Sequence, residues 1–130
     1  KLNKFDLIKL FQEGSQPVIL SRQQQDEQHI FQLEFPPELA CFKGHFPNFP
    51  IYPGVGQIAF LQHFVRELWA DLRWCQGFEQ LKFQDLIRPY HVLQLSLSRK
   101  QHKVSFELKF ADKNIASGRL LFAVEENATS

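Results

Sequence analysis

Residues 44–55 place a histidine at the start of a proline-rich segment that reads GHFPNFPIYPGV. Pro47, Pro50 and Pro53 stand at every third position of this segment. Each proline fixes its own φ at about −65° and biases the preceding residue toward extended geometry. The segment is therefore predicted to be stiff and extended, and a stiff segment would hold the His45 imidazole in a fixed position.

Gly54 is predicted to begin a long helix, because Pro53 directly precedes it and a helical pattern of apolar residues follows. The first backbone N–H groups of a helix have no partner within the helix and lie at the positive end of its dipole. A glycine at this point leaves the N–H unobstructed. This arrangement suits a thioester, because the Gly54 N–H can polarise the carbonyl while His45 takes a proton from the adjacent carbon.

The predicted helix extends from Gly54 to about Leu72, and apolar residues cover well over half of its circumference. A helix with so wide an apolar surface is expected to be buried and not laid on the outside of the protein. Its apolar positions are Val55, Ile58, Ala59, Leu61, Phe64, Val65, Leu68, Trp69 and Leu72.

Alternating apolar and polar residues on both sides of this helix predict strands. Before it, a hairpin half buried on one face is expected to open at Val18, turn over the polar residues 23–26 and return through Phe31, Leu33 and Phe35. The other expected elements are a short helix ending before Gly14, a turn at Gly77, strands over residues 80–85, 93–97, 104–110 and 115–124, and a frayed tail over about 125–130.

This order of elements predicts an α+β fold in which a curved antiparallel sheet wraps around one long central helix. With 130 residues, the chain is expected to form a single domain over residues 1–130. Apolar residues make up 44% and charged residues 22%, as is typical of a globular protein. No apolar run reaches the roughly 18 residues of a membrane-spanning helix, and the N-terminal residues lack a signal-peptide pattern. A cytoplasmic location without a membrane partner is therefore expected.

The net charge is +1, but residues 81–120 hold eight Lys and Arg against three Asp and Glu. Such a bias either attracts an acidic partner or reflects solvated strand faces, and it is too weak to indicate nucleic acid. The histidines and the two cysteines show no metal-ligand spacing, so neither a metal nor another cofactor is expected.

The motif Gly-His-Phe-Pro-x-x-Pro-Ile-x-Pro-Gly-Val resembles the active-site motif of the 3-hydroxyacyl-(acyl-carrier-protein) dehydratases of bacterial fatty acid synthesis. The order of strands and helix is similar over nearly the whole chain. Gln57-Ile58 after this motif is similar to the branch associated with aryl-polyene synthesis. The resemblance implies a hot-dog fold, an acyl carrier protein as partner, and a dimer whose two sheets join edge to edge with the active sites at the interface.

The resemblance also implies roles for residues of the motif. His45 would remove the α-proton of a (3R)-hydroxyacyl thioester, and the Gly54 N–H would polarise its carbonyl. Pro53 and Val55 are expected beside the substrate, while Phe46 either lines the acyl channel or packs the loop.

One departure from the family pattern concerns the central helix. The family carries an Asp or Glu fourteen residues after the histidine, which protonates the departing hydroxyl, and this chain has Ala59 there. His63 lies one helical turn further on and about 40° around the helix, so it either substitutes for the acid or only occupies a polar site beside the pocket. Glu67 and Asp71 are two and three turns away and are too far to replace the acid.

Three functions fit these residues. The first is a lyase that removes water from a 3-hydroxyacyl thioester on a carrier protein, as a homodimer. The second is a catalytically impaired subunit, either an acyl-binding module or one half of a heterodimer whose partner supplies the missing acid. The third is an acyl thioesterase, which generally also uses a helix carboxylate, so Ala59 counts against it.

Overall fold

The structure is a computed structural model, and it describes residues 16–36 and 54–124. The elements are the strands β1 (Val18–Gln25), β2 (Gln28–Glu34), β3 (Leu72–Phe83), β4 (Val92–Lys100), β5 (Lys103–Phe110) and β6 (Lys113–Val124), and the helix α2 (Gly54–Leu68). The expected helix before Gly14 and the expected tail lie outside the described residues.

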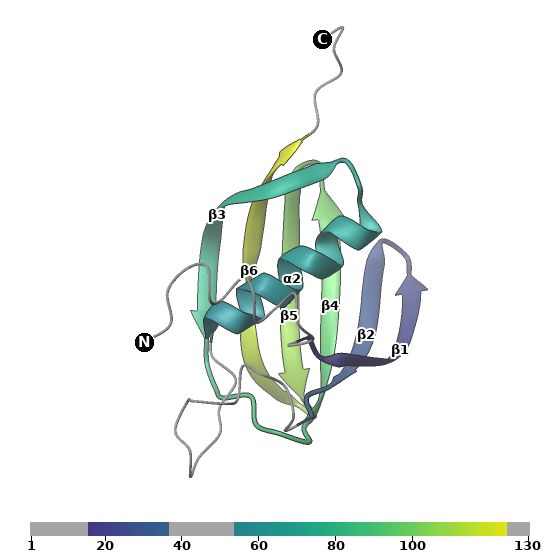
Figure 1. Cartoon of the computed structure of the whole chain (residues 1–130), viewed down its shortest axis with the longest axis vertical. Helices are drawn as coiled ribbons and strands as arrows, with labels where there is room; N and C mark the ends of the chain where they lie inside the picture. The colour runs from purple at the N-terminus through teal and green to yellow at the C-terminus, as the bar shows by residue number, and fades with distance from the viewer. Residues whose placement is uncertain (1–15, 37–53, 125–130) are drawn as a thin grey trace, which may run out of the picture.

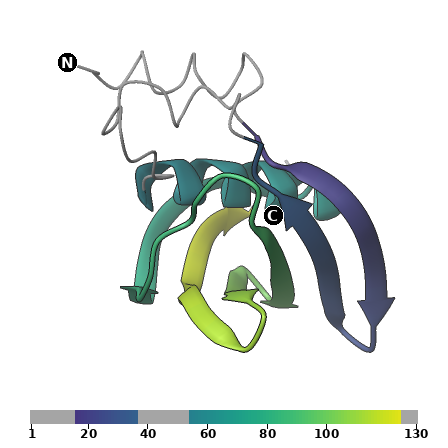
Figure 2. The ribbon, with the colours of Figure 1, turned by 90° about the horizontal axis from the view of Figure 1, so that it is seen from below.

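The six strands form one sheet in the order β1-β2-β4-β5-β6-β3, and every neighbouring pair is antiparallel. The sheet curves, and α2 crosses its concave face (Figures 1 and 2). The predicted α+β architecture, a curved antiparallel sheet wrapped around one helix, is confirmed. The strand β3 follows α2 in the sequence and forms the edge of the sheet opposite β1. In both views the first turn of α2 lies beside β3.

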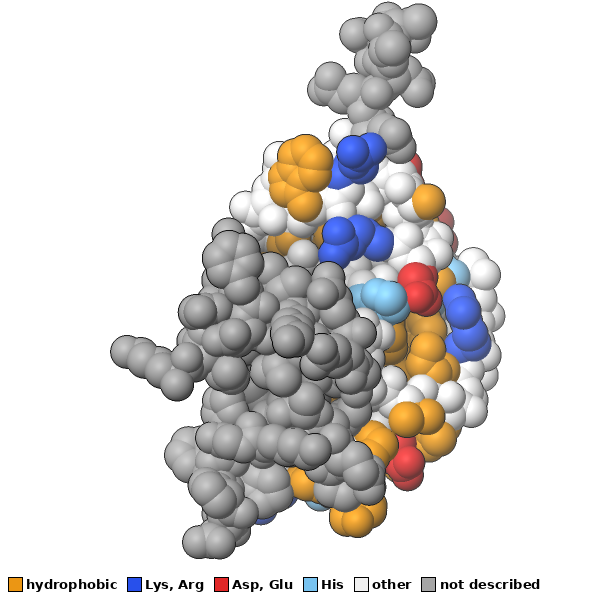
Figure 3. Space-filling model, in the orientation of Figure 1, with side chains coloured by type: hydrophobic (Ala, Val, Ile, Leu, Met, Phe, Trp, Pro, Cys, Tyr) orange, Lys and Arg blue, Asp and Glu red, His pale blue; other side chains and the backbone are white. Residues whose placement is uncertain are grey.

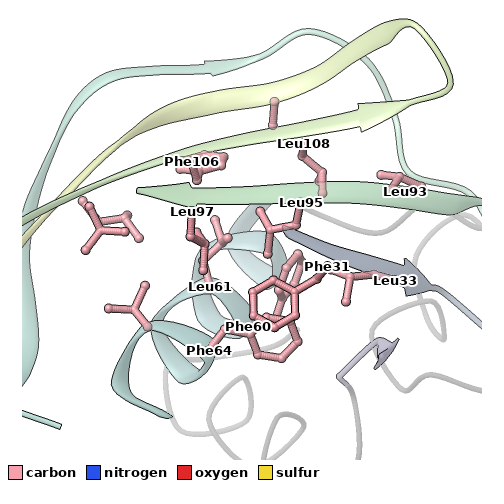
Figure 4. Close-up of a cluster of buried hydrophobic side chains, with 14 of the residues drawn as sticks. Phe31, Leu33, Phe60, Leu61, Phe64, Leu93, Leu95, Leu97, Phe106 and Leu108 are labelled. Atoms are coloured by element: carbon pink, nitrogen blue, oxygen red, sulfur yellow. The ribbon is translucent and has the colours of Figure 1, made fainter. Parts of the chain in front are cut away.

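The core lies between α2 and the concave face of the sheet. Phe60, Leu61 and Phe64 project from the helix toward side chains of the strands (Figure 4). Along β2, β4 and β5 the sheet contributes every second residue, as the period-two pattern requires, whereas in β6 the neighbours Ile115 and Ala116 are both buried. Its fully or nearly buried members on the three central strands and β2 are Phe31, Leu33, Leu93, Leu95, Leu97, Val104, Phe106, Leu108, Ile115, Ala116, Leu120 and Phe122.

The predicted hairpin is present, but its turn and burial differ from the expectation. The strand β1 continues through Gln25, and the turn falls on Asp26 and Glu27, where Asp26 adopts a φ of 58°. Only β2 is half buried, whereas every residue of β1 is exposed. The reason is topological: β1 is an edge strand and pairs with β2 alone.

The helix ends earlier than predicted, and the expected turn at Gly77 is wrong. The helix α2 stops at Leu68, and Leu72 is buried as the first residue of β3. Gly77 lies within β3, where the register against β6 shifts between Cys75 and Gly77. A glycine in a strand often marks such a bulge, so the sequence signal was one of irregular pairing and not of chain reversal.

Most of the helix is at least partly buried. Phe60, Leu61, Phe64 and Val65 are buried, whereas Arg66 and Glu67 are exposed. The other helix residues between Gln57 and Leu68 are buried or partly buried, so the expected burial of the helix is confirmed for this part of α2, with its exposed residues close to the C-terminal end.

Candidate functional site

The first turn of α2 places its backbone N–H groups, which have no partner within the helix, at the positive end of the helix dipole. No acidic side chain is present in this turn. A negative or polarised group from outside the helix is therefore the natural complement of this end. The predicted helix start at Gly54 is confirmed.

The structure describes only some of the other residues of the signature. His45, Phe46 and Pro53 lie outside the described residues, so their predicted roles stay predictions. Val55 is the second residue of α2.

Ala59, His63 and Glu67 succeed one another at intervals of four along α2 and so follow one side of the helix. Ala59 is half-buried, and the His63 side chain is 44% exposed. The Nε2 atom of His63 lies 2.7 Å from Oε1 of Glu67. Histidine, basic and acidic side chains gather on the face of the molecule that α2 occupies (Figure 3).

The helical spacing excludes Glu67 as a replacement for the missing acid, because it lies two turns from Ala59. The structure shows that it contacts His63 and can hold the imidazole. The interval of four residues was the signal for this pair, since side chains at i and i+4 are neighbours on a helix.

Gln57 was not recognised from the sequence as a polar residue of the core. Its side chain is 2% exposed, and its Oε1 atom is buried without a hydrogen-bond partner in the described structure. The signal was its spacing, because Gln57 lies three and four residues before Phe60 and Leu61, both of which are buried. It therefore occupies the face of α2 that packs on the sheet.

The opposite end of α2 is held by a network of matched polar and aromatic groups. Arg99 donates two hydrogen bonds to Asp71, of 2.8 and 2.6 Å, and its guanidinium lies 6.0 Å from the centre of the Trp69 ring. The edge of His29 meets Trp69 at 5.3 Å between ring centres. Hydrogen bonding by Arg99 holds the pKa of Asp71 below its ordinary value, so this carboxylate is engaged in structure.

Among the described residues, no group of three His, Cys, Asp or Glu side chains could hold a metal ion. None of the helices in this part of the chain is both long and apolar enough to cross a membrane.

The basic residues of the segment 81–120 are largely paired with acidic side chains. Lys103 and Arg119 both approach Glu79, Lys113 pairs with Asp85, and Arg99 pairs with Asp71. This pairing favours the interpretation that the local excess of positive charge belongs to solvated strand faces.

A curved antiparallel sheet around one helix, with an open helix start as its candidate site, defines a hot-dog protein. A family model described as ApeI dehydratase, ApeI-like, matches residues 21–119 of the chain. The chain belongs to this ApeI-like dehydratase family.

Curated relatives agree with this assignment. The chain is 32% identical over 97 residues to the 3-hydroxyacyl-(acyl-carrier-protein) dehydratase FabZ of Lactobacillus helveticus, a match that covers 65% of this chain and 66% of the relative. It is 36% identical over 73 residues to FabZ of Lawsonia intracellularis, covering 48% of each chain. The matches thus span just under two thirds and about half of these relatives.

Solved structures are similar over more of the chain. A chain of the dehydratase heterocomplex ApeI:P from Xenorhabdus doucetiae is 29% identical with a TM-score of 0.77, covering 83% of this chain and 98% of that one. The dehydratase domain of the CurJ module of curacin polyketide synthase, at 21% identity and a TM-score of 0.64, shares the fold; 83% of this chain and 42% of that one are covered. The predicted membership of a hot-dog dehydratase family, and so the relationship to lyases of the dehydratase type, is confirmed.

Proposed function

We propose that this protein acts on 3-hydroxyacyl thioesters and eliminates water from them. The observation that carries the proposal is the start of α2 at Gly54, a helix N-terminus without an acidic side chain in its first turn, directly after the His45 signature. His45 would take the proton from C2, the hydroxyl would leave C3 as water, and a double bond would form between C2 and C3. The Gly54 N–H would stabilise the charge that develops on the thioester oxygen. Phe46, Pro53 and Val55 would border the substrate.

Ala59 is expected to limit the rate of this reaction. A methyl group cannot donate a proton to the departing hydroxyl, and general acid catalysis is worth about 10²–10⁴-fold in rate. Within the proposal, His63 is the candidate substitute, because it lies one turn from Ala59 on the same side of the helix. The contact with Glu67 at 2.7 Å would fix its ring.

The experiment is the hydration of a trans-2-enoyl thioester, which is the reverse reaction, measured for purified wild type and three variants. His45→Ala should abolish activity, and Ala59→Asp should raise it by about 10²–10⁴-fold. His63→Gln, which keeps a polar side chain without a titrating imidazole, should lower the wild-type rate if His63 serves as the acid.

The outcomes separate the roles of these residues. An inert wild type with an active Ala59→Asp variant would mean that the pocket is intact and only the acid is missing. Unchanged activity in His45→Ala would contradict the proposed base. Absence of activity in wild type and Ala59→Asp alike, with or without a second hot-dog subunit, would overturn the dehydratase function.

The second candidate is a subunit that needs a different partner to complete its site. Two observations favour it: the alanine at position 59, and the similarity to a chain of a heterocomplex. In the family each site takes its histidine from one protomer and its carboxylate from the other, so a partner with an intact carboxylate would complete one site. Co-purification with a second hot-dog protein, with activity only in the complex, would support this candidate over the homodimer.

For either dimer, β3 is the proposed joining strand. It is one of the two edge strands of the sheet and carries the exposed apolar side chains Trp74 and Phe78, which are 57% and 46% exposed. An exposed apolar edge strand is a template for pairing with another chain. Since the first turn of α2 lies beside β3, pairing through this edge would place two sites at one interface (Figure 1).

Analytical ultracentrifugation of Phe78→Lys tests this edge. The variant should sediment as a monomer, whereas the matched change Leu20→Lys on the opposite edge strand β1, at a residue 51% exposed, should leave the dimer intact. Dissociation by Leu20→Lys and not by Phe78→Lys would assign the interface to β1.

An acyl carrier protein is the proposed bearer of the thioester, on the basis of the FabZ relatives. A cytoplasmic location is proposed with it.

A further inference from the structure

Gln57 is the one buried polar side chain found within residues 16–36 and 54–124. Its Oε1 atom is buried and has no hydrogen-bond partner in that part of the chain. An acceptor in this state has lost its hydrogen bonds to water and gained none in return, which destabilises the folded protein. A residue that carries such a cost at the start of a helix calls for a role that the fold alone does not supply.

The chemistry of the carboxamide limits the group that could satisfy it. One terminal atom accepts hydrogen bonds and the other donates them. A hydroxyl group both donates and accepts, so it can match whichever atom of the carboxamide faces it. A hydrocarbon chain can match neither.

The position of Gln57 agrees with one particular hydroxyl. Gln57 follows Gly54 by three residues, which is roughly 4.5 Å along the helix axis, and both lie on nearly the same side of α2. In a 3-hydroxyacyl thioester, the hydroxyl is borne two carbons from the thioester carbonyl. If the carbonyl meets the Gly54 N–H, the hydroxyl lies within reach of a side chain one turn further along.

We infer that Gln57 is a substrate-binding residue that selects 3-hydroxyacyl thioesters by a hydrogen bond to their 3-hydroxyl group. This inference rests on the proposed function and adds the residue that distinguishes a hydroxylated acyl chain from a saturated one. The carboxamide does not donate the proton for elimination. It holds the hydroxyl in place, and it is unmatched until the substrate arrives.

The test compares the binding of two soluble probes to the full chain by isothermal titration calorimetry. The probes are 3-hydroxyhexanoyl-N-acetylcysteamine and hexanoyl-N-acetylcysteamine, which differ only in the 3-hydroxyl. Wild type should bind the hydroxylated probe at least about tenfold more tightly, because a site built to pair a hydroxyl rejects the analogue that lacks it. Gln57→Met, close in length and apolar, should lose this preference and keep its affinity for the saturated probe.

Two further measurements make the result decisive. Gln84→Leu, which removes an exposed glutamine outside the strands and the helix, should behave as wild type. The Tm of Gln57→Met should equal or exceed that of wild type, since the change removes an unmatched buried acceptor. Gln57→Leu provides a second apolar variant should the methionine fail to fold.

Each remaining outcome counts against the inference in a distinguishable way. If wild type and Gln57→Met show the same preference between the probes, Gln57 does not read the hydroxyl. A lower Tm of both Gln57 variants would mean that the side chain makes a structural hydrogen bond, and would also overturn the inference. If wild type binds neither probe, the proposed function fails together with it.

Discussion

The two ends of α2 differ in how their polar groups are paired. At its C-terminal end, Arg99 donates two hydrogen bonds to Asp71, and the Trp69 ring contacts Arg99 and His29. At its N-terminal end, the first turn has no acidic side chain, and Gln57 is buried with an unmatched acceptor. Both ends rest on the same aromatic core.

This difference between the two ends distinguishes polar groups that stabilise the fold from polar groups that are available to a ligand. A polar network with every partner present fixes the geometry of the chain, while an unmatched group raises the free energy of the folded state until something binds it. Local departures from an otherwise consistent structure concentrate at functional sites. The C-terminal end therefore anchors the helix, and the N-terminal end is where a ligand is expected.

The largest effect on stability is expected in the aromatic core, against which both ends of α2 pack. Phe64 is 4% exposed and packs against Phe31 and Phe60 at 5.4 and 5.8 Å between ring centres. Phe64→Ala should lower the free energy of unfolding by about 3–5 kcal/mol, measured by urea denaturation. Phe83→Ala, at a position 46% exposed, should cost less than about 0.5 kcal/mol. Equal losses in the two variants would show that α2 is not the centre of the core.

The anchored end is tested by Trp69→Ala. The change removes the ring that meets His29 and Arg99, and because Trp69 is only partly buried, we expect a loss of about 2–3 kcal/mol in unfolding free energy. Tyr90→Ala is the control, since Tyr90 is 72% exposed and lies outside the strands. Thioester binding by the folded fraction should be unchanged. A loss of binding equal to that of His45→Ala would remove the distinction between the two ends.

The open end is expected to respond in the opposite direction. Gln57→Met should raise the free energy of unfolding by about 1 kcal/mol, because an apolar side chain replaces an unmatched buried acceptor. The measurement is the urea midpoint with an unchanged slope. A decrease would place Gln57 among the structural groups.

The smallest effect concerns pH at the anchored end. Arg99 lowers the pKa of Asp71 from its ordinary value of 3.8, first through its hydrogen bonds. A carboxylate with a lowered pKa stabilises the fold above its ordinary pKa, and this contribution is lost as the pH falls through the lowered value. The stability difference between wild type and Asp71→Asn should therefore be present at pH 7 and shrink below about pH 4. Since the pair is exposed, the difference should also shrink in high salt.

A control for this pH effect is Asp112→Asn, an exposed aspartate between β5 and β6. Its difference from wild type should not follow the same profile. A constant difference for Asp71→Asn between pH 7 and pH 3 would contradict the role of the Arg99 hydrogen bonds.

Much of the fold could be predicted because its signals are local. Alternation along Leu93, Leu95 and Leu97 predicted β4, and Pro53-Gly54 predicted the start of α2. The errors arose where one local signal fits two structures. Gly77 fits a turn or a bulge, and only its pairing with β6 decides between them. Leu72 fits the periodicity of the helix, yet the chain leaves the helix after Leu68 and Leu72 opens β3.

The candidate site divides in the same way. The sequence by itself determined the motif around His45, the glycine at the helix start and the alanine at position 59, because these depend on residue type and spacing. Only the tertiary structure decided that Asp71 is held by Arg99, 28 residues away, and that Gln57 is buried without a partner. Burial and pairing depend on which strands cover which face of the helix, and that arrangement is set by contacts between residues far apart in the chain.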